Sequence, residues 1–150
     1  MKFSRQTAIV GIGATEFSKN SGRTPMQLAT ECSLKACEDA GIEPSLINGI
    51  SVFSAEKNTE IEVARNLGIP ELTFFSMIHH GGGAPGGVIQ QAAMAVDSGV
   101  ADYVLVYRAF NERSWHGFGT GVQGRHQSPE AFDVSFSWSS PFGLLTPASW

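Results

Sequence analysis

Two histidines stand directly before three glycines in the segment His79-His80-Gly81-Gly82-Gly83, and an apolar run typical of a helix follows them. A glycine-rich turn at the start of a helix exposes unpaired backbone N–H groups and the positive end of the helix dipole. Such donors stabilise a thioester enolate or a thiolate. The glycines could equally serve only to let the helix pack closely against a sheet, and the residues themselves leave both interpretations open.

Two other kinds of chemistry fit the same segment less well. Neighbouring residues on an extended segment point to opposite faces, so one metal ion is not expected to bind both His79 and His80. The run from His80 to Gly83 is also similar to the oxyanion loop of lipases and esterases. No Gly-x-Ser-x-Gly motif occurs in the chain, so a serine hydrolase would lack its nucleophile.

Polar residues Asn111-Glu112-Arg113-Ser114 follow an apolar run that is predicted to be a strand. Active-site loops of open α/β sheets gather at the carboxyl ends of strands, although a solvated turn with local ion pairs would look the same. Gly11-Ile12-Gly13 begins like a dinucleotide-binding motif, but Glu16 stands in place of its third glycine and no helix follows at once. We therefore expect a simple turn from a strand into a loop there.

Strand and helix patterns alternate in the segments that must position these residues. Thr24-Pro25-Met26-Gln27 supplies an N-cap, a helix-starting proline and a capping-box glutamine, and Gly41 suits the left-handed position after a helix. The predicted strands are 7–12, 50–53, 72–78 and 103–107, and the predicted helices are 25–40, a second one between Thr59 and Gly68, and 86–96. This alternation predicts an α/β fold with right-handed crossovers.

The run from Gly86 to Val96 is apolar on nearly all sides, so we expect its helix to be buried in the middle of the fold. Residues 1–110 are expected to form the α/β core. Residues 111–150 break the pattern, because they carry many aromatic side chains among Gly, Ser and Pro without a sustained period. A loop of this kind is not expected to be a bare linker, so we expect a second copy, another subunit or further sequence to bury it.

Composition excludes several classes of protein. The 150 residues carry a net charge of −4 and no basic run, so a nucleic-acid partner is not expected. No apolar stretch is long enough for a membrane span or a signal peptide, which predicts a soluble, cytoplasmic protein. Cys32 and Cys37 cannot form a disulfide framework or a zinc ribbon, and we expect both to pack within a helix because nothing near them would lower a thiol pKa.

Several blocks of the sequence together resemble the thiolase superfamily, and within it the lipid-transfer-protein or sterol-carrier-protein-X branch with its steroid side-chain aldolases. The blocks are 8–17, 81–84, 90–96, 99–102, 107–114 and 142–150, so the likeness spans essentially the whole chain. Chains of this family are more than twice as long and contain two similar halves. The resemblance implies a thiolase-like N-terminal half, a layered α/β structure with a mixed, mostly parallel sheet and a buried central helix, without the second half.

The nucleophilic cysteine of thiolases falls on or near Gly82 here, and no cysteine stands close to it in the sequence. The resemblance therefore favours the aldolases, which cleave a β-hydroxyacyl-CoA by retro-aldol chemistry and need no covalent acyl-enzyme. It implies that the N–H groups of Gly82 and Gly83 contact the thioester or enolate and that His80 donates a proton. Asn111 and Glu112 are candidates for substrate contacts. Most acid and base groups are expected in the other half.

The resemblance also implies partners and leaves two alternatives. It implies a steroid acyl-CoA substrate with no other cofactor and no metal, a homodimer, and a partner protein that carries an OB-fold and a zinc ribbon. One alternative is a non-catalytic thiolase-fold subunit for assembly or lipid binding. The other is an acetyl-CoA acetyltransferase of the sterol-carrier branch, which the missing cysteine disfavours.

Overall fold

The computed structural model describes residues 6–53, 56–78, 83–111 and 140–143. By their internal contacts, Met1–Phe17 with Arg23–Phe110 form one unit, and Ser18–Gly22 with Asn111–Trp150 form another. The described part of the second unit contains the short 3-10 helix η4 (Ser140–Phe142), whose Phe142 is exposed. All of the elements described below belong to the first unit.

Helices α1 (Pro25–Ala40) and α2 (Glu60–Leu67) begin and end at local signals. In α1, Thr24 Oγ1 accepts a hydrogen bond from the Gln27 N–H at 3.1 Å, and Gln27 Oε1 accepts one from the Thr24 N–H at 2.8 Å. Thr59 forms the same capping box at the start of α2, and a left-handed glycine ends each helix. The predicted bounds of both helices are confirmed.

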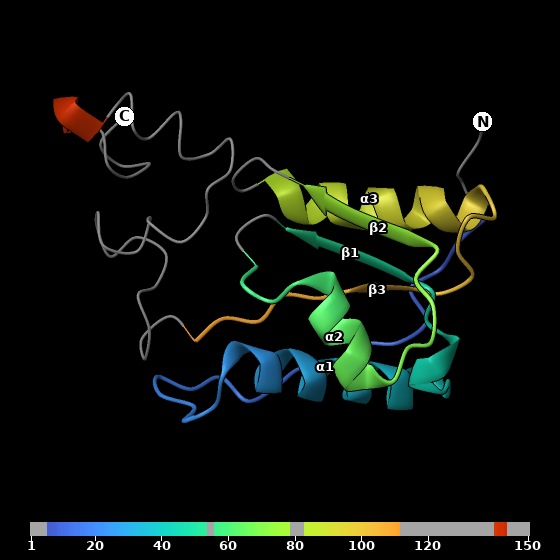
Figure 1. Ribbon diagram of the computed structural model, residues 1–150, viewed down its shortest axis with the longest axis horizontal. Coiled ribbons are helices and arrows are strands. Elements are labelled where there is room, and N and C mark those ends of the chain that lie inside the picture. Colours follow the sequence, from blue (N-terminus) through green and yellow to red (C-terminus); the bar gives the residue numbers. More distant parts are fainter. Residues whose placement is uncertain (1–5, 54–55, 79–82, 112–139, 144–150) are drawn as a thin grey trace. The chain divides into compact units, whose positions relative to one another are not determined.

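Three parallel strands form the sheet, in the order β2 (Phe74–Ile78), β1 (Gly49–Phe53) and β3 (Val104–Val106) (Figure 1). In the register of the sheet, Ile50 of β1 lies opposite Phe75 of β2 and Leu105 of β3. All five residues of β1 are buried, as expected for a central strand whose two faces are both covered by helices. The short helix η1 (Pro44–Leu46) leads into this strand.

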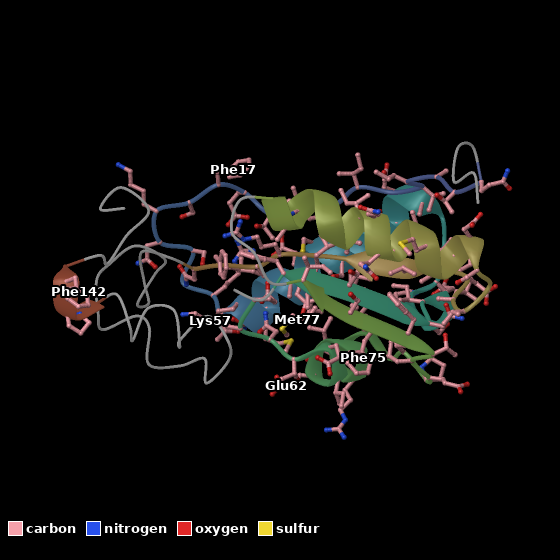
Figure 2. All side chains as sticks on the ribbon, turned by 90° about the horizontal axis from the view of Figure 1, so that it is seen from above. Phe17, Lys57, Glu62, Phe75, Met77 and Phe142 are labelled. Atoms are coloured by element: carbon pink, nitrogen blue, oxygen red, sulfur yellow. The ribbon has the colours of Figure 1, made fainter. Side chains whose placement is uncertain are left out.

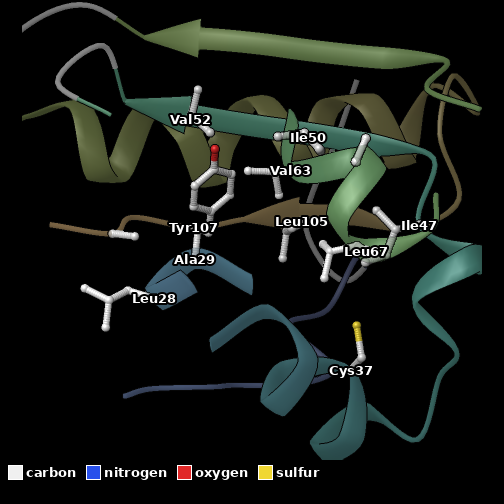
Figure 3. Packing of buried hydrophobic residues seen from close by; sticks show 12 residues of the cluster. Leu28, Ala29, Cys37, Ile47, Ile50, Val52, Val63, Leu67, Leu105 and Tyr107 are labelled. Atoms are coloured by element: carbon white, nitrogen blue, oxygen red, sulfur yellow. The ribbon is translucent and has the colours of Figure 1, made fainter. Parts of the chain in front are cut away.

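The two faces of the sheet pack against different helices. On one face, a cluster joins alternate residues of β1 to α1 and α2 (Figure 3); its strand members are Ile50, Val52 and Leu105. On the other face, Phe53 packs with Ala84 and Val88 of α3 (Ala84–Asp97), and the Ser51 hydroxyl donates to the Val88 carbonyl oxygen at 3.1 Å. The structure is therefore a layered α/β fold, as predicted.

Helix α3 buries one face among the described residues. Ala84, Val88, Ala92 and Ala95 are buried against the sheet. Ile89 and Met94 are 47% and 39% exposed. The sequence predicts a helix buried on nearly all sides, but α3 is buried only on the face toward the sheet. Within the described part of the chain, no helix combines the length and the apolar character needed to cross a bilayer.

The prediction of a buried strand at residues 7–12 is wrong. These residues belong to no strand, and Ile9 and Ile12 are 72% and 76% exposed. The segment is held by α1 instead: the Ile12 N–H donates to Asp39 Oδ2 at 2.8 Å, and the Lys35 ammonium donates to the Ala14 carbonyl oxygen at 3.2 Å. An apolar run predicts an extended segment, but it does not predict which element will hydrogen-bond the N–H and C=O groups of that segment.

The close contact with α1 explains the glycines of this segment. A Cβ added at Gly11 would lie 2.2 Å from the Ala36 carbonyl oxygen, and one at Gly13 would lie 2.1 Å from that of Cys32. Only a residue without a Cβ fits between these backbones. Close packing against α1 therefore accounts for Gly11 and Gly13.

Candidate functional site at the carboxyl edge of the sheet

Helix α3 begins at the carboxyl edge of the sheet without a side-chain cap. Gly83 is its N-cap residue, and Pro85 in the first turn has no N–H to offer. The N–H groups at this end therefore belong to Gly83, Ala84 and Gly86. His80 and Gly82, the other predicted residues of this turn, lie outside the described residues.

Packing accounts for one glycine near this turn and not for another. A Cβ at Gly87 would lie 3.2 Å from Ile78 Cγ2, so this glycine lets α3 approach β2. A Cβ at Gly83 would meet nothing within 4 Å, and its φ of −81° is open to any residue. Neither packing nor backbone conformation within the described residues requires glycine at position 83.

An aromatic residue joins the start of α3 to the ends of two strands. Phe53, the last residue of β1, packs with Ala84, the first residue of α3. The guanidinium carbon of Arg108, two residues after β3, lies 5.5 Å from the centre of the Phe53 ring and 4.2 Å from that of Phe110. The carboxyl ends of parallel strands are where α/β proteins commonly place their sites.

Glu56 is a residue of this edge that the sequence interpretation missed. Its Oε1 accepts hydrogen bonds from the Asn58 side-chain amide at 2.7 Å, from the Lys57 N–H at 3.0 Å and from the Asn58 N–H at 3.3 Å. Its Oε2 accepts one from the Ala109 N–H at 2.7 Å. Glu56 thus joins the segment after β1 to the segment after β3. Its place along the chain can be found in Figure 2 from the labelled neighbour Lys57.

A second hydrogen bond joins the same two segments. The buried Tyr107 hydroxyl donates to the Asn58 carbonyl oxygen at 3.2 Å. Tyr107 is the last residue of the predicted strand 103–107, and Glu56 stands shortly after the predicted strand 50–53, as Asn111 does after 103–107. The rule that selected Asn111 and Glu112 would therefore have found them, had it been applied to every strand end.

Burial shifts the protonation of this cluster. It raises the pKa of the Glu56 carboxyl, and the hydrogen bonds from Ala109, Asn58 and Lys57 offset part of that rise. It also raises the pKa of Tyr107, as does the nearby charge of Glu56. The pKa of Cys32 is raised by burial and further by Glu56, and that of Cys37 by burial. The prediction that neither cysteine has a lowered thiol pKa is confirmed.

The structure does not test the predicted roles of Asn111 and Glu112. Asn111 belongs to the second unit, and Glu112 lies outside the described residues, so their roles stay predictions. Among the residues that the structure describes, no three His, Cys, Asp or Glu side chains gather in a group able to hold a metal ion.

Sequence comparison places these features among known proteins. No family model matches the chain. It is 56% identical over 143 residues to a steroid side-chain-cleaving aldolase of Thermomonospora curvata, a match that covers 95% of this chain and 37% of that protein. It is 54% identical over 146 residues to the 17-hydroxy-3-oxo-4-pregnene-20-carboxyl-CoA lyase of Mycobacterium tuberculosis, covering 97% of this chain and 38% of the relative.

Structure comparison agrees with the sequence. The solved Ltp2-ChsH2(DUF35) aldolase matches with a TM-score of 0.78 and 54% identity, over 95% of this chain and 35% of that one. A monomeric SCP2-thiolase like protein type 1 from Mycobacterium smegmatis matches with a TM-score of 0.54 and 25% identity, over 65% of this chain and 22% of that one.

The layered fold is thiolase-like. Within that class, the chain is a close homologue of the steroid side-chain-cleaving aldolases over nearly all of its length, and it spans little more than a third of the curated relatives it matches.

Proposed function

We propose that the chain is part of a thiolase-like aldolase that cleaves the β-hydroxyacyl-CoA of a steroid side chain by retro-aldol chemistry. The names of both relatives support this proposal. The observation that carries it is Gly83, a glycine at the uncapped start of α3 that neither packing nor backbone conformation requires. The space where a Cβ would stand lets a substrate oxygen approach the N–H groups.

The relative's substrate name defines the reaction. In a 17-hydroxy-20-carboxyl-CoA, the hydroxyl group is β to the thioester carbonyl. A base removes the hydroxyl proton, the C–O bond becomes a ketone, and the bond between the β- and α-carbons breaks. Its electron pair passes to the thioester as an enolate, which is then protonated at the α-carbon. The products are a ketone and propionyl-CoA, with no redox change and no covalent enzyme intermediate.

The roles of individual residues follow from this reaction. The N–H groups of Gly82 and Gly83 would hold the enolate oxygen, and His80 would donate the proton to the α-carbon. Asn111 and Glu112 would contact the substrate. The base that accepts the hydroxyl proton is proposed to lie in a part of the protein that the relatives contain beyond this match.

Partners and location belong to the same proposal. The matched aldolase structure is named for two components, Ltp2 and ChsH2(DUF35), which supports a heterocomplex. We propose that the partner carries an OB-fold and a zinc ribbon, as the family resemblance implies. We also propose a homodimer, a cytoplasmic location, and CoA only as part of the substrate.

The proposal is tested by measuring the ketone and propionyl-CoA released from a 17-hydroxy steroid 20-carboxyl-CoA, by the complete protein in complex with its partner protein and by the 150-residue chain alone. We expect release from the complex. Its absence in both preparations would contradict the proposal and favour the non-catalytic subunit. Formation of acetoacetyl-CoA and free CoA from two molecules of acetyl-CoA would instead support the acetyltransferase alternative.

The role of Gly83 is tested with a matched pair of variants. Gly83→Pro removes the N–H, whereas Gly83→Ala keeps it and fills the space through which the substrate oxygen would approach, since its Cβ meets no neighbour within 4 Å. Turnover is expected to fall in both variants, with native folding in Gly83→Ala. Removing one such donor typically lowers kcat by about 100-fold or more. We expect this loss in Gly83→Pro; unchanged turnover in Gly83→Pro, or in His80→Ala, would remove the respective role.

A further inference from the structure

Arg108 stands between two residues that are anchored to the neighbouring segment. Tyr107 and Ala109 are buried on either side of it, whereas its own side chain is exposed. The Tyr107 hydroxyl binds Asn58, and the Ala109 N–H binds Glu56. The backbone that carries Arg108 is therefore fixed on both sides.

The guanidinium of Arg108 is also held. It packs on Phe110 and Phe53, with distances to the ring centres of 4.2 and 5.5 Å. Aromatic faces attract a cation without using its N–H groups, so the edge of the planar guanidinium stays available to an anion. Among the described residues no carboxylate forms an ion pair with Arg108, and the Glu56 carboxylate accepts hydrogen bonds from four N–H donors instead.

The location of this cation matches the charge that the proposed reaction develops. Phe53 packs against Arg108 and belongs to the same apolar cluster as Ala84 and Val88 of α3, so the guanidinium lies beside the residue that joins the end of β1 to that helix. The enolate carries a negative charge that the ground-state thioester lacks. A held cation beside it would stabilise the transition state more than the substrate.

We propose that Arg108 is a further catalytic residue, whose guanidinium stabilises the enolate oxygen formed as the C–C bond breaks, and that Glu56 positions it through the bond to Ala109. The inference rests on the proposed function for the identity of the reaction. The electron pair of the broken bond reaches the thioester oxygen beside Arg108, and it returns to the α-carbon when that carbon is protonated.

The test uses the complete protein purified with its partner, and two readouts. The first is kcat and KM for steroid cleavage. The second is deuterium exchange at the α-carbon of propionyl-CoA in D₂O, which requires an enolate but no steroid. Exchange without cleavage would overturn the proposed function and leave the enolate site standing. No exchange by the unmodified protein would overturn the present inference.

Arg108→Met keeps much of the side-chain volume and removes the charge. We expect kcat and the exchange rate to fall by about 100-fold, with KM changed less than about threefold, because the charge to be stabilised is formed during the reaction. Arg65→Met, on the exposed face of α2, is the matched control and should leave both rates unchanged. A raised KM with unchanged kcat would assign Arg108 to ground-state binding and overturn the inference.

Glu56→Gln tests the positioning role. Whichever way its amide is turned, an NH₂ group faces at least one of the N–H donors that Glu56 now accepts. We expect kcat to fall by about tenfold alone and to fall no further when the change is added to Arg108→Met. Full additivity, with native circular dichroism in every variant, would overturn the positioning role.

Discussion

Glu56 carries a half-buried carboxyl group, and its hydrogen bonds show how the fold tolerates it. Four N–H donors replace much of the water that the carboxylate loses. They do not replace all of it, since burial still leaves the pKa of Glu56 raised. The residue thus gives up some stability to join two segments at the candidate site.

The raised pKa of Glu56 predicts how stability changes with pH. The folded carboxyl holds its proton more tightly than the unfolded one, so the folded state binds more protons between pH 4.5 and the raised value. The contribution of Glu56 to the free energy of unfolding therefore decreases as pH rises through that interval. Urea unfolding at a series of pH values should show this slope reduced in Glu56→Gln; an identical slope in both proteins would contradict the shift.

The raised thiol pKa values predict slow cysteine chemistry. Because only the thiolate reacts, we expect iodoacetamide to modify Cys32 and Cys37 of the folded chain more slowly than in the urea-unfolded chain at the same pH. Mass spectrometry of timed samples measures both rates. Cleavage activity should survive brief treatment, and rapid loss of activity with modification of Cys32 would mean that a thiol takes part.

At the scale of elements, local sequence signals determine where α1 and α2 begin and end, whereas packing determines where residues 7–12 lie. Each capping box predicts the start of a helix because its hydrogen bonds lie within four residues. Residues 7–12 have the composition of a strand, but contacts with α1 decide their place. Such contacts join residues that are distant in sequence, which a pattern of apolar residues does not encode.

The capping box of α1 should contribute measurably to stability. Thr24→Ala removes the acceptor for the Gln27 N–H and is expected to lower the free energy of unfolding by about 1 kcal/mol. Thr24→Ser keeps a hydroxyl and is the control. Urea denaturation of the three proteins measures the difference; equal stability of Thr24→Ala and the unmodified chain would show that the cap does not contribute.

The close approach of residues 7–13 to α1 should not tolerate a Cβ. In Gly11→Ala the new atom would meet backbone atoms of Ala36 and Ala40, so we expect a loss of about 1–3 kcal/mol and faster amide exchange in this segment. Gly86→Ala, in the first turn of α3 with open space around it, is the control. Unchanged exchange in Gly11→Ala would contradict the described packing.

At the scale of the whole molecule, much apolar surface is left uncovered among the described residues. Helix α3 exposes Ile89 and Met94, and β2 exposes Phe75, which is labelled in Figure 2. An apolar-lined groove of about 520 Å³ also opens beside β3, bounded by α1, α3 and residues 6–11. Surfaces of this kind are typical of protein interfaces.

These surfaces predict that the 150-residue chain expressed alone is not a well-behaved monomer. We expect concentration-dependent association in sedimentation velocity, since burying such side chains against a second chain is favourable. Phe75→Ser, on an exposed edge-strand position, should weaken the association without preventing folding. A concentration-independent monomer that melts cooperatively would contradict this prediction.

The sequence by itself determined the alternation of helices and strands, the ends of α1 and α2, and the absence of a cysteine at the turn before α3. These features depend on neighbouring residues or on residue identity. Only the tertiary structure decided that residues 7–12 lie against α1 and that α3 is covered on one face. It also decided that Glu56 and Tyr107 join the segments after β1 and β3, and that Arg108 packs on Phe53. Those outcomes depend on side chains that the chain brings together from about fifty positions apart, where hydrogen bonding and close packing select one arrangement among many that the local pattern allows.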